Sequence, residues 1–400
     1  MKLRILLITP WFQPAHGFGG TVQRLQKTSK YLSEWGHRIV VLTTDAVTTG
    51  VFDRTLPRVE INDNMTIYRF HGLASIRQFF LTPTMVRTAM KIASSSDIIH
   101  ACGMRNFQTD LGLLTSLARG RPLVIQGFAS VPIHQEPDSI MEPLLKLAHN
   151  GFTAKAEFRL ADSYIAASKF ERDAFIEAGV SPDKIELIPS GADLEEFEKK
   201  ESPGEKNITY GPRTILFVGR INIIKGLEVL LRAFKEVSAS FSGVHLVVAG
   251  VDQGYGHIMQ ATVDELELDN LVTWVRNPTR REIARLMHSC EMLVLPSYVE
   301  SNPIVIHEAG ACAKPVIASR VGGIPELIED GKNGLLVPKG DSSSLAMAIT
   351  RILQSPQLAL SLGQNLQKQV LSKYNWAVVA RTTEHLYYKL VNGTPKKTDA

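Results

Sequence analysis

The sequence predicts an α/β protein built from two tandem, doubly wound domains. Its 400 residues exceed the size of one ordinary hydrophobic core. Short runs rich in Val, Ile and Leu alternate with helical segments, which is the pattern of parallel strands covered by helices on both faces. The alternation stops in a charged, turn-rich stretch, residues 194–213, and then restarts. We interpret this stretch as an interdomain linker.

The first half of the chain is expected to form one domain. The apolar run LRILLIT predicts a buried first strand rather than a signal peptide. The segment breaks at Pro10 and lacks the small-residue cleavage site that a signal peptide would have. Residues 20–36 predict an amphipathic helix that ends at Gly36. The later strands of this half are expected at RIVVLTT, DIIHAC, PLVIQG, SYIAAS and KIELIPS.

The second half repeats the pattern. Strands are expected at TILFVG, VHLVVAG, LVTWV, MLVLPS and PVIAS, with helices over 226–241, 257–268, 280–289 and 303–313. We therefore predict an N-terminal domain over 1–195, a linker over 196–212 and a C-terminal domain over 213–374. The remaining residues, 375–400, predict a helix that packs back toward the N-terminal domain.

Composition narrows the class of protein. A hydrophobic content of 44% and a charged content of 21% are typical of a globular protein, and no apolar run approaches the ~20 residues of a membrane helix. Three widely spaced cysteines favour a reducing, cytoplasmic compartment over a disulfide framework. The sequence contains no Asp-x-Asp and no close pair of histidines, so no metal site is predicted.

Charge is distributed unevenly along the chain. Residues 1–130 contain 15 Lys plus Arg against 7 Asp plus Glu, although the whole chain carries only +4. This surplus suits an acidic partner or an anionic membrane surface, or it simply keeps the surface solvated. The segment 76–93, IRQFFLTPTMVRTAMKIA, mixes apolar and basic residues without an acid. It could contact an anionic bilayer, or it could be a loop followed by a core helix.

Two carboxylates flank an Asn-Pro break in the stretch ESNPIVIHE. Asn302 is a good N-cap and Pro303 suits the first helical position, so a helix is expected to begin there. Glu300 would then lie in the loop after a strand, and Glu308 in the second turn. Ligands of open α/β sheets bind at such strand ends, and two acceptor groups suit a polyhydroxylated ligand. Alternatively, Glu300 caps the helix and Glu308 is solvated.

Two other loops at strand ends suit an anion. Arg220 and Lys225 follow a strand that ends at Val218 and precede a helix, so two cations and a helix N-terminus could bind a pyrophosphate. The alternative is a pair of surface cations. In the first domain, the glycine-rich loop with Gly19 and Gly20 lies between the first strand and helix. It lacks the G-x-G-x-x-G spacing of a dinucleotide site.

These motifs, taken in order, resemble the retaining glycosyltransferase family 4. The resemblance covers nearly the whole chain and rests on an ordered set of segments: PWFQP and the following GG, AASKFERDAFIEAGVSPDKIELIPSGADLEEF, FVGR with Lys225, PSYVESNPIVIHEAGACAKPVIAS, VGGIPELI and NGLLVPKGD. It implies the GT-B architecture, in which two Rossmann-like domains face each other across a cleft.

The resemblance also implies a reaction and assigns roles. It implies metal-independent, retaining transfer of a sugar from a UDP- or GDP-sugar to a hydroxyl of a glycan or lipid-linked acceptor, with no cofactor and no nucleic acid partner. Glu308 would bind the ribose hydroxyls and Glu300 the donor sugar. Arg220 and Lys225 would hold the diphosphate. The other expected donor-binding residues are Gly19, Gly20, Asn302, Pro303, Ile304 and Val305.

One position departs from the family pattern. Family members often show a His-x-His at the end of the fourth strand. Here His100 occupies the first position, and Cys102 stands in place of the second histidine. If the strand runs that far, both side chains share one face. His100 is expected to act on the acceptor side, unless it is a structural histidine. Other readings of the chain are a sugar-nucleotide epimerase or a nucleotide-sugar binder without transfer. The expected location is the cytoplasm or the inner face of the membrane.

Overall fold

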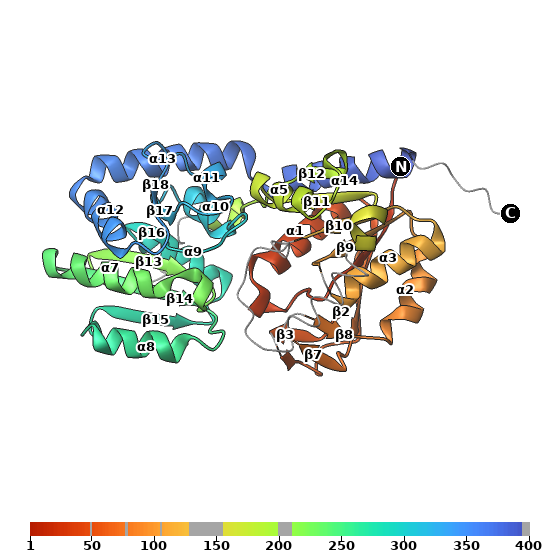
Figure 1. Cartoon of the computed structure of the whole chain (residues 1–400), viewed down its shortest axis with the longest axis horizontal. Helices are drawn as coiled ribbons and strands as arrows, with labels where there is room; N and C mark the ends of the chain where they lie inside the picture. Colours follow the sequence, from red (N-terminus) through yellow and green to blue (C-terminus); the bar gives the residue numbers. More distant parts are fainter. Residues whose placement is uncertain (49, 77–78, 105, 128–154, 199–209, 394–400) are drawn as a thin grey trace. The chain divides into compact units, whose positions relative to one another are not determined.

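The computed structural model describes residues 1–48, 50–76, 79–104, 106–127, 155–198 and 210–393 (Figure 1). They divide into two compact units. The first unit comprises Met1–Pro189 and the segment from Trp376 onward, and the second comprises Ser190–Asn375. Each contains one large, mainly parallel sheet with helices on its faces, which confirms the two predicted Rossmann-like folds.

The first unit contains an eight-stranded sheet in the order β12-β11-β10-β9-β1-β2-β6-β5. All neighbours are parallel except β5 and β6. The sheet strands are β1 (Arg4–Ile8), β2 (Arg38–Thr44), β5 (Val59–Asn62), β6 (Met65–Phe70), β9 (Ile98–Cys102), β10 (Leu123–Gln126), β11 (Ser163–Ala166) and β12 (Ile185–Leu187). Two small hairpins pair β3 (Ala46–Thr48) with β4 (Val51–Phe52) and β7 (Ala74–Ile76) with β8 (Phe79–Leu81).

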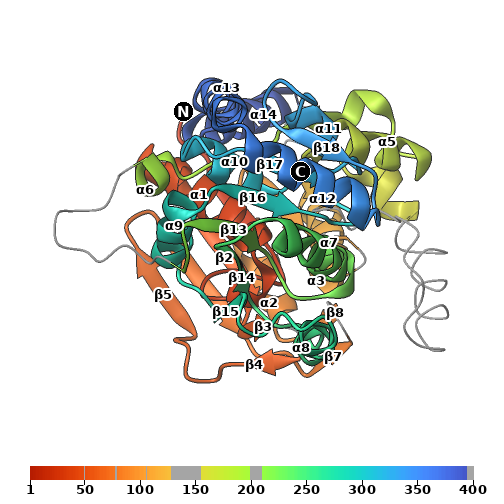
Figure 2. The ribbon, with the colours of Figure 1, turned by 90° about the vertical axis from the view of Figure 1, so that its left-hand side faces the viewer.

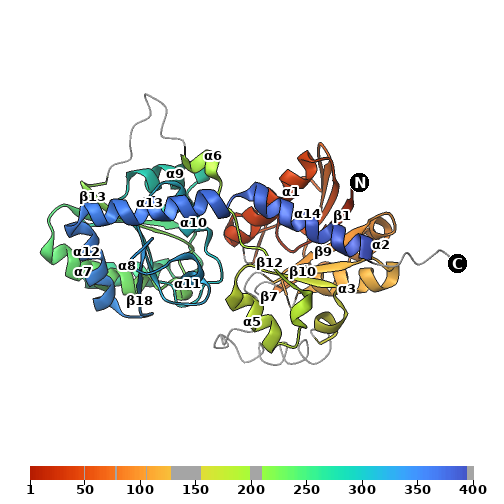
Figure 3. The ribbon, with the colours of Figure 1, turned by 90° about the horizontal axis from the view of Figure 1, so that it is seen from above.

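Helices cover both faces of this sheet. Within the described residues, the α-helices are α1 (Gly20–Glu34), α2 (Met85–Ala93), α3 (Phe107–Arg119), α5 (Lys169–Glu177) and α14 (Trp376–Gly393), with short 3₁₀ turns η1 (His16–Phe18) and η2 (Pro182–Lys184). Leu6, Ile8 and Ile99 pack in the core beneath α2 and α3. The alternate residues face α1 and α14, which lie side by side although they come from opposite ends of the sequence (Figure 3).

The second unit contains a six-stranded parallel sheet in the order β15-β14-β13-β16-β17-β18, with β13 between β14 and β16 (Figure 2). Its strands are β13 (Arg213–Val218), β14 (Val244–Gly250), β15 (Val272–Arg276), β16 (Met292–Leu295), β17 (Val316–Ser319) and β18 (Leu335–Val337). Its helices are α6 (Leu194–Glu198), η3 (Ile223–Lys225), α7 (Leu227–Ser240), α8 (Gly256–Glu265), α9 (Arg280–Ser289), α10 (Ile304–Ala311), α11 (Ile324–Leu327), α12 (Ser342–Gln354) and α13 (Pro356–Lys373).

Two separate cores explain why these runs are so apolar. Ile215, Phe217 and their neighbours pack against α7, α8 and α12, whereas Leu216 and Val218 pack on the opposite face with residues of α9, α10 and α13. A strand buried on both faces needs an apolar residue at every position. Within the described residues, no helix combines the length and hydropathy needed to cross a bilayer.

The predicted linker differs from the structure at its start. Residues 194–198 form α6 within the second unit, because Phe197 is fully buried in the core beside α9 and α10. Two apolar residues, Leu194 and Phe197, among three acids are too short a stretch to give a periodic signal, so this helix was not predicted. Of the rest of the predicted linker, residues 199–209 lie outside the described residues. Strands β5, β6 and β18 of the two large sheets were also not predicted.

Candidate functional site

The order of strands in the second unit creates one topological switch point. From β13 the chain proceeds to β14 and β15 on one side, whereas β16, β17 and β18 lie on the other side. The connections that follow β13 and β16 therefore lead in opposite directions, away from the space between the carboxyl ends of these two strands. Open α/β sheets bind ligands at such a position. The loops that begin at Gly219 and Pro296 both start at this edge. They carry Arg220, Lys225 and Glu300.

Arg220 is a cation without a close counter-ion in the part of the chain that the structure describes. Among the described residues, its guanidinium makes no hydrogen bond or close ion pair, although the charge of Glu300 is near enough to act on it. Burial lowers the pKa of Arg220, and the attraction of Glu300 opposes this effect. Because removing a charge from water is costly, a partly buried and unpaired cation is suited to an incoming anion.

Lys225 and Glu300 form an ion pair. Lys225 Nζ lies 2.5 Å from Glu300 Oε1, and the two side chains are only 13% and 10% exposed. Ser297 Oγ donates to the same oxygen at 2.9 Å, and the backbone N–H of Gly323 donates to the Glu300 carbonyl at 3.0 Å. Contacts from three loops therefore fix Glu300. Two residues that were predicted to bind different parts of a donor are paired with each other here.

The loops after β13 and β16 also touch through their backbones. Gly226 has φ +64°, and a Cβ atom there would lie 2.1 Å from the carbonyl oxygen of Pro296. The N–H of Tyr298 donates to the Ile224 carbonyl at 2.8 Å. Only glycine tolerates both the positive φ and this close approach. The turn that carries Lys225 is therefore held against the loop that carries Glu300.

The start of α10 differs from the prediction. The helix begins at Ile304, and Pro303 rather than Asn302 is the N-cap, without a side-chain cap. Asn302 is engaged elsewhere: its Oδ1 accepts a hydrogen bond from the Ser190 N–H at 2.9 Å and lies 3.2 Å from His307 Nε2. The first amides of α10, at Ile304 and Val305, have no side-chain cap and no intrahelical acceptor.

Glu308 is buried rather than solvated. Its side chain is 4% exposed, and Oε1 lies 2.6 Å from Nη1 of Arg280. The solvated alternative is therefore excluded. No sequence signal marks Arg280, because an arginine in the first turn of a helix resembles an ordinary surface residue. Only the packing of α9 beside α10 brings it to Glu308.

In the first unit, the glycine-rich loop precedes α1 at the corresponding switch point between β1 and β9. Gly19 is the N-cap of α1 with φ +55°, and the space around it is open. Gly20 is the first helical residue. The structure therefore places the predicted anion cradle at a helix N-terminus without a side-chain cap. Its role toward a donor stays a prediction.

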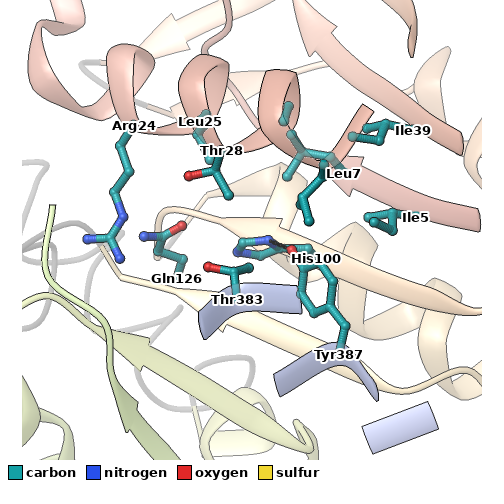
Figure 4. Close-up of a pocket in the computed structure, with 12 residues that line it drawn as sticks. Ile5, Leu7, Arg24, Leu25, Thr28, Ile39, His100, Gln126, Thr383 and Tyr387 are labelled. Carbon is teal, nitrogen blue, oxygen red and sulfur yellow. Dashed lines mark hydrogen bonds between the residues drawn. The ribbon is translucent and has the colours of Figure 1, made fainter. Parts of the chain in front are cut away.

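His100 and Cys102 share one face of β9, as expected if the strand reaches Cys102, and both are buried. His100 Nδ1 lies 2.6 Å from the Tyr387 hydroxyl, and Nε2 has no partner among the described residues. Burial lowers the pKa of His100 to about 3. His100 lines a cavity of about 20 Å³, the size of one water molecule (Figure 4). This environment favours the structural alternative, and an acceptor-side role stays a prediction.

Arg24 is a second arginine that sequence analysis missed. It lies on α1 with 3% of its surface exposed and donates to the Ile188 carbonyl. In the amide orientation that satisfies both groups, the side-chain oxygen of Gln126 accepts from Arg24 Nε at 2.6 Å. Burial lowers the pKa of Arg24 to about 10, although Glu171 and Cys102 act in the opposite direction. An arginine on an amphipathic helix predicts exposure, so no sequence signal indicated this position.

Comparisons with known proteins agree with the two-unit division. The family model described as "Glycosyltransferase Family 4" matches residues 18–196, and the model described as "Glycosyl transferases group 1" matches residues 198–369. A D-inositol 3-phosphate glycosyltransferase of Segniliparus rotundus is 30% identical over 374 residues, which cover 89% of this chain and 82% of that protein.

Two solved structures share the fold over nearly the whole chain. Anabaena HepE in complex with UDP superposes with a TM-score of 0.78 at 23% identity, covering 97% of this chain and 100% of that one. Sucrose-phosphate synthase from Thermosynechococcus elongatus gives a TM-score of 0.77 at 23% identity, covering 98% of this chain and 100% of that one.

Proposed function

Because this chain belongs to glycosyltransferase family 4, and is thus a group 1 glycosyltransferase of GT-B fold, we propose that it transfers a sugar from a nucleotide-diphosphate sugar to a hydroxyl acceptor. We further propose that the transfer retains the anomeric configuration and needs no metal ion or other cofactor. The observation that carries the proposal is Arg220, which has no close counter-ion in the part of the chain that the structure describes and lies at the switch point of the second unit.

Arg220 and Lys225 would bind the diphosphate of the donor. Both precede α7, whose N-terminus has no side-chain cap, and anions bind readily at such helix ends. Lys225 is paired with Glu300. Donor binding would replace this pair: the diphosphate would take Lys225, and the sugar hydroxyls would take Glu300. Glu308, which lies on α10 after the same loop, would bind the ribose.

The chemistry follows from where charge develops. Negative charge grows on the leaving diphosphate, so fixed cations and helix N-termini stabilise the transition state more than the bound donor. The acceptor hydroxyl would attack on the face that the diphosphate leaves and pass its proton to a leaving phosphate oxygen. Glu300 would act as a binding group rather than a nucleophile, because a transfer in which the leaving diphosphate takes the acceptor proton needs no carboxylate nucleophile.

The acceptor is proposed as a glycan or a lipid-linked hydroxyl compound. The name of the Segniliparus relative adds a phosphorylated cyclitol as a candidate, since it describes transfer to D-inositol 3-phosphate. The test offers UDP- and GDP-sugars with acceptors of each class and determines the anomeric configuration of the product by NMR. We expect a retained configuration and undiminished activity in EDTA. An inverted product or a requirement for Mg²⁺ or Mn²⁺ would contradict the mechanism.

The same assay separates the two alternative functions. An epimerase would convert the nucleotide sugar into its epimer without any acceptor. A binder without transfer would bind the nucleotide sugar but release no nucleoside diphosphate in the presence of any acceptor. Release of diphosphate that depends on acceptor excludes both.

A contact with an anionic membrane on the cytoplasmic side is also proposed, in a revised form. Phe80 and Met85, two apolar residues of the segment 76–93, are fully buried and cannot reach a bilayer. On the adjacent α3, however, Leu114 and Leu117 are 54% and 57% exposed, and Arg87 and Lys91 of α2 are exposed as well. Apolar and basic side chains together are typical of an interfacial surface.

The membrane contact is tested by co-sedimentation with vesicles. We expect binding to anionic vesicles but not to neutral ones, and a loss of binding in Leu114→Gln/Leu117→Gln. Indifference of the wild-type protein to both kinds of vesicle would reject the contact.

A further inference from the structure

Arg280 occupies a position that local rules disfavour. It is the first residue of α9, and the positive end of a helix dipole repels a cation. A capping box fixes this helix start: Thr279 accepts from the Glu282 N–H at 3.2 Å, and the Glu282 carboxylate accepts from the Thr279 N–H at 2.7 Å. A cation that is fixed at a helix N-terminus, where the dipole disfavours it, indicates that its side chain has a role in contacts outside this helix.

The side chain of Arg280 is held on several sides. Nη1 lies 2.6 Å from Glu308 Oε1, Nε lies 3.7 Å from Glu196, and the guanidinium stacks over Phe197 with its carbon 4.8 Å from the ring centroid. Burial acts to lower the pKa of Arg280, but Glu308 and Glu196 outweigh this effect and raise it. Glu196 and Phe197 both belong to α6, so Arg280 connects α6 to the carboxylate on α10.

The contact leaves half of the Glu308 carboxylate available. Arg280 is 35% exposed, whereas Glu308 is 4% exposed and depends on this cation to compensate its charge. Oε1 is occupied by Arg280, but Oε2 makes no hydrogen bond with any residue that the structure describes. An ionised carboxylate can accept about four hydrogen bonds, so Oε2 can still accept two hydroxyls.

We propose that Arg280 is a positioning residue for nucleotide binding: it orients Glu308 through Oε1 so that Oε2 accepts the ribose hydroxyls of the donor. This inference rests on the proposed function, in which Glu308 is the ribose-binding group. Arg280 acts through Glu308 and does not contact the ribose itself.

The test compares ligands with and without ribose hydroxyls. Binding of UDP and GDP, each alongside its 2′,3′-dideoxy counterpart, is measured by calorimetry for the wild type, Arg280→Gln and the control Arg232→Gln, which replaces an exposed arginine of α7. We expect Arg280→Gln to weaken binding of the preferred nucleotide by roughly tenfold or more and to leave its dideoxy counterpart unchanged. In turnover, KM for the donor should rise while kcat is preserved, because only uniform binding is lost.

Each outcome decides a separate claim. Equal losses for the ribonucleotide and the dideoxynucleotide would show that Arg280 contacts the base or phosphates, and no loss would show that Glu308 needs no support; either result overturns the inference alone. A wild-type protein that binds neither nucleotide overturns the proposed function together with the inference.

Two further variants keep the test decisive if Arg280→Gln folds poorly. Arg280→Lys keeps a cation over Phe197 and should recover part of the ribose-dependent affinity. In a Glu308→Gln background, replacing Arg280 by Gln should cause no further loss, because the group that it positions is already altered. Additive losses in the double variant would show that the two residues act independently.

Discussion

Arg220 and Lys225 lie in one loop, but their surroundings differ. Lys225 already satisfies Glu300, whereas Arg220 has no counter-ion among the described residues. The same substitution at the two positions therefore has different consequences for stability. Removing Lys225 leaves the nearly buried Glu300 carboxylate without its cation, although Ser297 still donates to it, and this costs about 1–3 kcal/mol. Removing Arg220 breaks no such contact.

We predict that Arg220→Ala and Lys225→Ala both lower kcat by roughly a hundredfold, and by more than they weaken donor binding, because the leaving-group charge grows toward the transition state. Lys225→Ala should also lower the melting temperature, whereas Arg220→Ala should not. Steady-state kinetics and calorimetry check the two parts, with Arg232→Ala as the control. Losses that arise only through KM would contradict the role in transition-state stabilisation.

His100 is expected to make stability depend on pH. Its pKa is about 3 in the folded chain, compared with an ordinary value of 6.5. As pH falls below 6.5, the unfolded chain takes up a proton that the folded chain cannot accept. The folded state therefore loses about 1.4 kcal/mol for each pH unit over this window, and nothing above it. His307, whose pKa burial also lowers to about 3, adds a similar dependence in the second unit.

We predict that His100→Gln reduces the loss of stability of the first unit between about pH 7 and about pH 5 by roughly 1–2 kcal/mol relative to wild type. Denaturant unfolding at the two pH values measures this difference, and Arg232→Gln should leave it unchanged. Turnover near pH 7 tests the other role: a structural histidine predicts near-normal activity, whereas an acceptor-side histidine predicts a loss on the order of a hundredfold. An unchanged pH dependence of unfolding would reject the buried, neutral state.

At the scale of elements, the candidate site depends on how the turn before α7 meets the loop after β16. Gly226 makes this contact, since any side chain there would meet the Pro296 carbonyl. Gly254 also has a positive φ, of +89°, but nothing lies within 4 Å of the position that a Cβ would occupy. The two glycines therefore separate the effect of crowding from the effect of backbone strain.

We predict that Gly226→Ala lowers both the melting temperature and donor affinity, because the turn with Lys225 must move away from Glu300. Gly254→Ala should cost only about 1–2 kcal/mol of backbone strain and leave donor affinity near wild type. Thermal unfolding and donor titration of both variants provide the comparison. If the two alanines have equal effects on affinity, close contact between the loops is not what positions Lys225.

At the scale of the whole molecule, the first unit is completed by the end of the chain. On α14, Glu384 lies 2.7 Å from the fully buried His37, and Tyr387 is 2% exposed and contacts His100. Without α14, these buried histidines and the apolar residues beneath them would face water. Residues distant in sequence are therefore needed to stabilise residues 1–189.

We predict that a chain ending at Asn375 loses stability in the first unit, while the second unit keeps its own core. Limited proteolysis should cut such a chain rapidly within residues 1–189 and leave a resistant fragment from 190 onward. A chain that ends at Gly393 keeps α14 and serves as the control. Equal resistance of the two truncated chains would show that α14 is dispensable for the first unit.

The sequence by itself determined the two sheets and the edge at which the site lies. Strands buried on both faces require continuous apolar runs, and the polar or glycine-rich residues that follow must lie at the carboxyl ends. Arg220, Lys225, Glu300 and Glu308 could therefore be located from local pattern alone, and the ordered motifs indicated the family. The local pattern gave a wrong N-cap at Asn302, because its side-chain oxygen accepts a hydrogen bond from the distant Ser190 N–H instead of capping the helix.

Only the tertiary structure decided the partners of the charged groups. Arg280 and Glu308 pair although they are 28 positions apart, and His100 contacts Tyr387 from 287 positions away. Whether Arg220 finds a counter-ion among the described residues depends on which groups pack around it. The free energy of a charged side chain is set by its neighbours and its exposure to water, and both follow from the order of the strands and the packing of helices on them. The sequence pattern identifies which residue type lies at a strand end, but it does not show which distant residue contacts that side chain in the folded chain.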